Sequence, residues 1–117
     1  MKKNRFIPYG YTMRNGKMVI EKTEAEVIRR IFSAYIDGAS LKEIAVELTA
    51  QQVPYTEKKT EWFKGRISRI LENRKYCGNA EFDKIIDDET FMEAFDAKSA
   101  RQVAIPGDLD VEIYAVK

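Results

Sequence analysis

The chain of 117 residues contains no histidine and a single cysteine, Cys77. Without histidine, it lacks the most common general base and the most common metal ligand of proteins. One cysteine excludes an internal disulfide and any cysteine-rich zinc site. Most familiar catalytic constellations cannot be built from this sequence, and we expect neither a metal site nor a cofactor.

Long apolar runs are missing as well. No stretch approaches the roughly 20 apolar residues that cross a bilayer. The positively charged segment 1–5 leads into Phe6-Ile7-Pro8 rather than into the apolar core of a signal peptide. A chain of 117 residues that is 44% hydrophobic suffices for one modest core. We therefore expect one globular domain in the cytoplasm, without membrane contact.

The net charge of +1 hides an uneven distribution of charges. Residues 1–80 carry 16 Lys and Arg against 9 Asp and Glu, a balance of +7. Residues 81–117 carry 4 against 10, a balance of −6. The basic part is thus the candidate surface for a polyanionic partner, and the acidic last third is a poor one.

A β-hairpin is predicted over residues 9–20. Asn15-Gly16 supplies the positive φ angles of a type I′ turn. Tyr11-Thr12-Met13 and Met18-Val19-Ile20 have strand-like composition on either side of that turn. This hairpin is the β-structure that we expect to accompany an otherwise mainly helical chain.

Two pairs of residues with capping-box spacing predict the starts of two helices. Thr23 with Glu26 predicts a helix over about residues 24–37, which Gly38 would end. Ser40 with Glu43 predicts a second helix to about residue 51. The apolar residues at helical spacing are Ile28, Ile31, Phe32 and Tyr35 in the first helix, and Leu41, Ile44, Ala45 and Leu48 in the second.

Residues 62–78 are the most informative stretch, because they combine an amphipathic helix with a basic outer face. Residues 52–60 contain Pro54 and a polar run, and predict a loop before this helix. The apolar stripe consists of Phe63, Ile67, Ile70 and Leu71. The opposite face consists of Gly65, Ser68, Arg69 and Glu72, flanked by Lys64 and Arg66. We expect Trp62 and Tyr76 in the core, with the helix held against Ile44 and Leu48.

The remainder predicts two short strands and a fourth helix. Residues 79–84 and the alternation of Leu109, Val111, Ile113 and Ala115 predict the strands. Asp87 can cap a helix that runs to about residue 102, with Phe91, Ala94, Phe95 and Lys98 at helical spacing. The expected fold class is α+β and mainly helical, with a helix-turn-helix and a small antiparallel hairpin.

An ordered set of residues over about 8–102 gives a family resemblance. Its members are Pro8-Tyr9-Gly10-Tyr11, Glu24-Ala25, Ile28-Arg29-Arg30-Ile31-Phe32, Tyr35, Gly38-Ala39-Ser40-Leu41-Lys42-Glu43-Ile44-Ala45, Leu48, Trp62, Ile67, Ile70-Leu71, Asn73, Tyr76, Gly78 and Ile85-Ile86-Asp87-Asp88-Glu89-Thr90-Phe91. In these residues the chain resembles the recombinase domain of the large serine recombinases, the phage integrases and transposon resolvases of bacteria. It departs at Phe63, where many relatives carry Ser or Thr as a helix cap, so we expect the cap to come from elsewhere, with Thr60 as the candidate.

The resemblance implies a recombinase domain over residues 1–102, followed by an acidic extension over 103–117. It implies duplex DNA as the partner, together with a catalytic serine domain and a zinc-ribbon domain that this chain does not contain, and dimers or tetramers of the full-length protein. We therefore interpret the chain as an excised or truncated binding module that is not itself an enzyme. Ser40 is expected to act as a helix cap rather than as a nucleophile.

For DNA contact, Arg69 is the first candidate for base readout, because a guanidinium can bond two acceptors on guanine. Ser68 and Glu72 on the same face are weaker candidates. Two readings of Gly65 stay open: a side chain there would collide with DNA, or the glycine is a neutral change. The expected phosphate contacts are Lys58, Lys59, Lys64, Arg66, Arg74 and Lys75. Two other classes stay open: a stand-alone helix-turn-helix regulator, and a protein-interaction domain whose basic helix meets an acidic partner.

Overall fold

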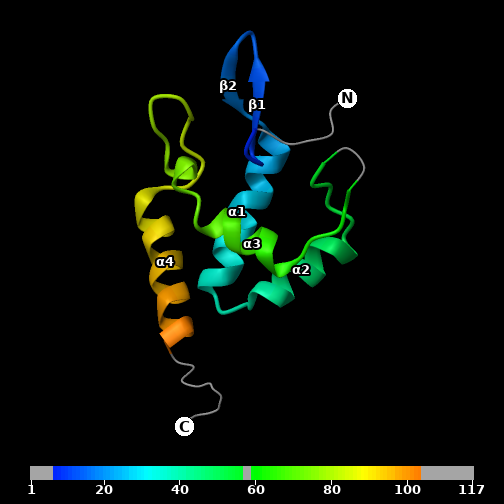
Figure 1. Cartoon of the computed structure of the whole chain (residues 1–117), viewed down its shortest axis with the longest axis vertical. Helices are drawn as coiled ribbons and strands as arrows, with labels where there is room; N and C mark the ends of the chain where they lie inside the picture. Colours follow the sequence, from blue (N-terminus) through cyan, green and yellow to red (C-terminus); the bar gives the residue numbers. More distant parts are fainter. Residues whose placement is uncertain (1–6, 57–58, 104–117) are drawn as a thin grey trace.

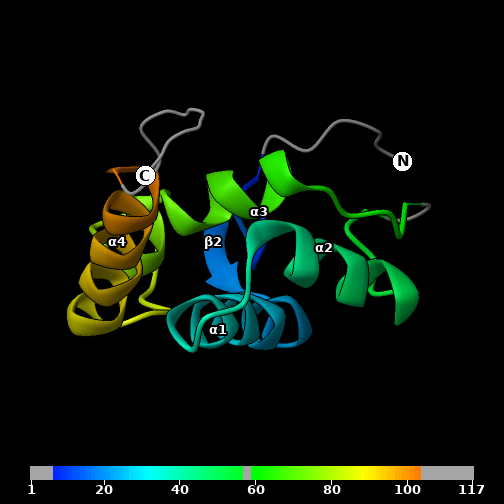
Figure 2. The same cartoon turned by 90° about the horizontal axis from the view of Figure 1, so that it is seen from below.

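The computed structural model describes residues 7–56 and 59–103 (Figure 1). Their elements are β1 (Tyr11–Arg14), β2 (Lys17–Ile20), α1 (Lys22–Ile36), α2 (Leu41–Ala50), α3 (Lys64–Leu71), the 3-10 helix η1 (Arg74–Cys77) and α4 (Asp88–Val103). In Figure 2, α3 lies above α1, α2 lies to one side of them and α4 to the other. This arrangement is the mainly helical fold with one hairpin that the sequence predicted.

The hairpin forms at the predicted turn. Strands β1 and β2 pair antiparallel, with Arg14 opposite Lys17 next to the turn. Asn15 and Gly16 have φ angles of 53° and 79°, the left-handed pair that a type I′ turn requires. The hairpin extends beyond the helical body in Figure 1, so its tip is exposed.

Helix α1 begins earlier than the sequence predicted, and the Thr23–Glu26 capping box was wrong. Its N-cap is Glu21, whose carboxylate accepts the backbone N–H of Glu24. The backbone N–H of Glu21 donates to the carbonyl of Gly10 at 2.9 Å, so the end of the hairpin fixes the residue at which the helix starts. At the other end, Gly38 follows the helix with a φ of 115°, as predicted.

Helix α2 has the predicted capping box. The Ser40 hydroxyl accepts the N–H of Glu43 at 3.0 Å, and the Glu43 carboxylate accepts the N–H of Ser40 at 2.9 Å. The helix ends at Ala50, after which a loop leads to Trp62. Trp62 is fixed to α2 through Thr49 Oγ1, which accepts its backbone N–H at 2.8 Å, and its indole N–H donates to the Val53 carbonyl at 2.8 Å.

The core contains the residues that were predicted to hold α3 in place. Trp62, Tyr76 and the three apolar residues of α3 are buried together with Ile44 and Leu48 of α2; those three residues are Ile67, Ile70 and Leu71. The four predicted apolar residues of α1 are also buried. Tyr9 and Tyr11 belong to the same core, and their hydroxyls donate to the backbone of Pro54 and of Lys75 and Asp83.

Three details of the prediction were wrong or lie outside the structure. Residues 79–84 form a turn rather than a strand, because the Asn79 side chain accepts the N–H groups of Glu81 and Phe82 and so bends the chain. Phe63 and Phe95 are each 47% exposed, although their spacing placed them with apolar positions. The strand predicted over residues 109–115 lies outside the described residues. Asp87 caps α4 as predicted, accepting the Thr90 N–H at 2.8 Å.

Candidate nucleic-acid interface

Helix α3 carries the outer face that its sequence predicted. Lys64, Gly65, Arg69 and Glu72 are exposed, and Ser68 is half-buried. The N-cap of the helix is Phe63, without a side-chain cap, so the expected cap by Thr60 was wrong. The uncapped first turn leaves backbone N–H groups of α3 without a side-chain acceptor from its cap residue.

Arg66 is held in place rather than extended into solvent. Its guanidinium carbon lies 3.7 Å from the ring centre of Tyr55 and 4.5 Å from that of Phe63. Its Nη1 donates to the Glu61 carbonyl at 2.7 Å. Tyr55 in turn stacks on Tyr9, with ring centres 5.3 Å apart and planes 5° apart. The cation is thus one layer of a stack that starts in the core.

Glu72 is engaged by a neighbouring helix. Its carboxylate lies 3.0 Å from Nζ of Lys98 on α4. The Lys98 side chain is only 12% exposed and the Glu72 side chain 56%, so the pair lies where α3 and α4 meet. An acid in an ion pair is a weaker candidate for base readout than the sequence alone suggested, and Lys98 is a cation next to α3 that sequence reasoning did not assign to the site.

The other residues that the sequence predicted to contact DNA phosphates lie before or after α3 in the chain. Arg74 and Lys75 are exposed on η1, where their cations lie 5.1 Å from the ring of Phe91 and 5.5 Å from the ring of Phe82. Lys59 is exposed in the loop before α3, and its carbonyl accepts the N–H of Tyr55. Lys58 lies outside the described residues.

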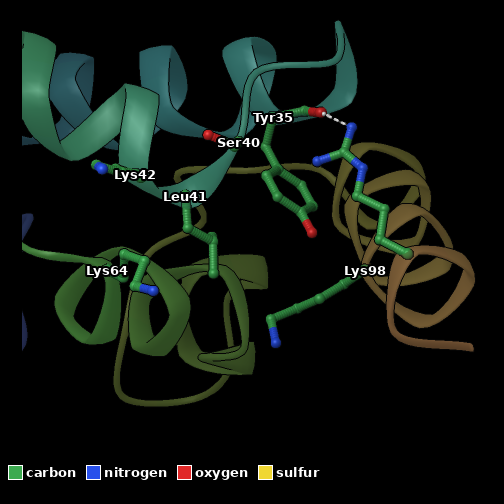
Figure 3. A pocket seen from close by; sticks show the side chains of 7 residues that line it. Tyr35, Ser40, Leu41, Lys42, Lys64 and Lys98 are labelled. Atoms are coloured by element: carbon green, nitrogen blue, oxygen red, sulfur yellow. Dashed lines mark hydrogen bonds between the residues drawn. The ribbon is translucent and has the colours of Figure 1, made fainter. Parts of the chain in front are cut away.

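A surface pocket of about 400 Å³ opens beside α3 (Figure 3). It is lined by Tyr35, Ser40, Leu41, Lys42, Lys64, Lys98 and Arg101. Arg101 donates to the carbonyls of Tyr35 at 2.8 Å and Ala39 at 3.1 Å, so it ties α4 to the end of α1. In the lining of this pocket, Lys42 of α2 and Lys98 of α4 join Lys64 of α3, so cations from all three helices meet there. Because three separate helices supply these cations, helical periodicity within any one of them could not group them.

Two titratable groups at or next to η1, Cys77 and Tyr11, have raised pKa values. Burial, and then the nearby Asp88 carboxylate, raise the pKa of the Cys77 thiol, which disfavours its ionisation to the nucleophilic thiolate. Cys77 is half-buried. Burial, with Asp83 nearby, raises the pKa of Tyr11 to about 12. Within residues 7–56 and 59–103, no cluster of His, Cys, Asp or Glu could hold a metal ion, and no helix is long and apolar enough to span a bilayer.

The fold and this surface define a small helical domain that presents a short helix with a basic outer face. The model of the Recombinase family matches residues 22–101. The chain therefore belongs to the Recombinase family.

Two solved structures share the fold at low sequence identity. One, described as "Crystal Structure of a LSR-DNA Complex", matches with a TM-score of 0.71 and 19% identity over 97% of this chain. The other, described as "Sequence Requirements of the Listeria innocua prophage attP site", matches with a TM-score of 0.66 and 19% identity over 85% of this chain. The matches cover 38% and 45% of those two chains, so this chain corresponds to less than half of either.

Proposed function

We propose that the chain is the DNA-binding module of a site-specific serine recombinase of the phage integrase or transposon resolvase type. It recognises part of an attachment site in duplex DNA. The observation that carries this proposal is the exposed basic face of α3 on a Recombinase-family fold. The order α2, loop, α3 is that of a helix-turn-helix, in which the second helix enters the major groove. The structures described as an LSR-DNA complex and as concerning an attP site support the same reading.

Within this module, Arg69 reads a base edge. Ser68 has a lesser role because it is half-buried. Glu72 also has a lesser role because it is paired with Lys98. Gly65 allows close approach of the helix to the groove. The phosphate contacts are the predicted set of Lys58, Lys59, Lys64, Arg66, Arg74 and Lys75, joined by Lys42 at the neighbouring pocket.

Strand cleavage belongs to another part of a longer parent protein. No serine of this chain acts as the nucleophile, and Ser40 already caps α2. The further partners are the catalytic and zinc-ribbon domains, and other copies of the parent recombinase in a dimer or tetramer. The module ends near residue 102, with 103–117 as an acidic extension, and works in the bacterial cytoplasm at the nucleoid.

The test is retention of duplexes from a random library by the purified chain at near-physiological salt. Enrichment of one asymmetric motif is the expected result. Arg69→Ala should then lose about 1–3 kcal/mol of discrimination at one base pair. The matched control is Arg30→Ala, because Arg30 is exposed on α1 and contacts Gln51 rather than α3. It should bind as the unmodified chain does.

Other results would change the assignment. A palindromic motif with self-association of the chain would favour the stand-alone regulator, since dimeric helix-turn-helix proteins bind two half-sites. Retention without a motif would reduce the role of the chain to phosphate binding. No retention even at low salt would contradict the proposal and favour the protein-interaction reading.

A further inference from the structure

Phe63 is a large apolar side chain that is exposed at the start of the basic helix α3. Among the described residues, the large apolar side chains that are exposed are Met13, Val46, Phe63, Met92 and Phe95. Phe63 alone among these adjoins α3, as its N-cap residue. Hydrophobic burial cannot account for this ring, because it is 47% exposed while the rest of the apolar stripe is 5% exposed or less.

The ring is nevertheless ordered by its neighbours. The Arg66 guanidinium lies 4.5 Å from the ring centre of Phe63 and 3.7 Å from that of Tyr55. Tyr55 stacks on Tyr9, which is 3% exposed. A side chain that is already oriented loses less conformational entropy when it contacts a partner. Phe63 is therefore preorganised through Arg66 and two tyrosines.

The space next to the ring is open. A Cβ added at Gly65 would lie 3.9 Å from the Phe63 ring and, apart from its two chain neighbours and the adjacent backbone of α3, would meet nothing else within 4 Å. Lys64 and Arg66 are the chain neighbours of Gly65, and the exposed Arg69 follows it by about one helical turn, so the sequence around this position is basic. An apolar group in a basic setting fits a partner that is anionic overall and presents a small apolar group.

In the major groove, the C5-methyl group of thymine is that apolar group, and Phe is among the side chains that contact it. The N-terminal residues of a recognition helix are the ones that reach base edges. We propose that Phe63 reads the methyl group of one thymine in the target duplex, with Arg66 as the positioning residue. This inference rests on the proposed function of the chain.

The experiment uses the duplex that the full chain enriches from the random library, with each dT replaced in turn by dU to remove only the methyl group. At one position, dU should weaken binding about four-fold, as expected for one methyl group withdrawn from an apolar contact. Phe63→Ser should bind the dT and dU duplexes equally. Serine is favoured at an N-cap, so this variant should fold at least as stably as the unmodified chain. Phe63→Leu should keep part of the preference.

Phe95→Ala is the matched control, because Phe95 is equally exposed at 47% but lies on α4. It should keep the full dT preference. The inference is overturned if no dU substitution weakens binding, if the enriched duplex contains no thymine, or if Phe63→Ser keeps the same dT preference. A library that yields no enriched duplex would instead contradict the proposed function, and the inference with it. Circular dichroism confirms that each variant is folded before binding is compared.

Discussion

Thr49 ties helix α2 to the residue that precedes the basic helix. Its hydroxyl oxygen accepts the backbone N–H of Trp62 at 2.8 Å, and the hydroxyl donates to the Trp62 carbonyl at 3.3 Å. Trp62 is 4% exposed and anchors the loop through Val53 as well. Replacing Thr49 by valine removes both hydrogen bonds to Trp62 and keeps the shape of the side chain.

The expected loss follows from the unpaired backbone of Trp62. Valine and threonine have similar helix propensities, so the helix itself changes little. A buried donor or acceptor left without a partner costs about 1–3 kcal/mol. Thr49 is half-buried, and water can replace part of the loss, so we expect Thr49→Val to lower the free energy of unfolding by about 1–2 kcal/mol. For a domain of this size, each kcal/mol lowers the melting temperature by roughly 4–8 °C.

Urea and thermal unfolding, followed by far-ultraviolet circular dichroism, measure this difference. Thr49→Ser is the control, because it keeps the hydroxyl and should retain most of the stability. The dependence of unfolding free energy on urea should be equal in all three proteins, since the surface exposed on unfolding is unchanged. If Thr49→Val were as stable as the unmodified chain, the hydroxyl would not hold the α2–α3 connection and this reasoning would fail.

Two further substitutions are informative: Gly65→Ala separates stability from binding, and Asp87→Asn tests the N-cap of α4. Gly65→Ala should raise stability by up to about 1 kcal/mol, because Gly65 is exposed in the first turn of α3 and alanine is the better helix former. The same variant should weaken binding to the enriched duplex, and unchanged binding would mean that DNA does not approach this position. Asp87→Asn tests the cap of α4, where hydrogen bonds from the side chain and then the backbone of Thr90 lower the pKa of Asp87. A carboxylate whose pKa is lower in the folded state stabilises the fold at pH values above its unfolded pKa of about 3.9. This stabilisation is lost as the pH falls through the folded pKa. Below about pH 5, the melting temperature of the unmodified chain should therefore drop more than that of Asp87→Asn. Equal pH profiles would contradict this role.

Local signals predicted the elements well where the residues that decide them are adjacent in the chain. Asn15-Gly16 determines the hairpin turn, and Ser40 with Glu43 determines the start of α2, because each device operates within four residues. The start of α1 depends instead on a hydrogen bond between Glu21 and Gly10 across the hairpin, which no local rule contains. The strand predicted over residues 79–84 was wrong although its cause is local: the side chain of Asn79 accepts the N–H groups of Glu81 and Phe82 and so competes with the backbone pairing of a strand.

Periodicity predicted which residues of α3 face the core, but it wrongly placed Phe63, which precedes the helix, in the same apolar stripe. Ile67, Ile70 and Leu71 are buried because they lie within helical turns that pack against α2, whereas Phe63 is the N-cap, with extended backbone angles to which a 100° step does not apply. The tertiary stack of Tyr9, Tyr55 and Arg66 then determines where its ring lies. A sequence with Ser or Thr at this position would cap α3 and present no ring. The same substitution that improves the helix start should therefore remove an apolar contact from the surface that we propose to face DNA, so Phe63→Ser separates stability from recognition at a single residue.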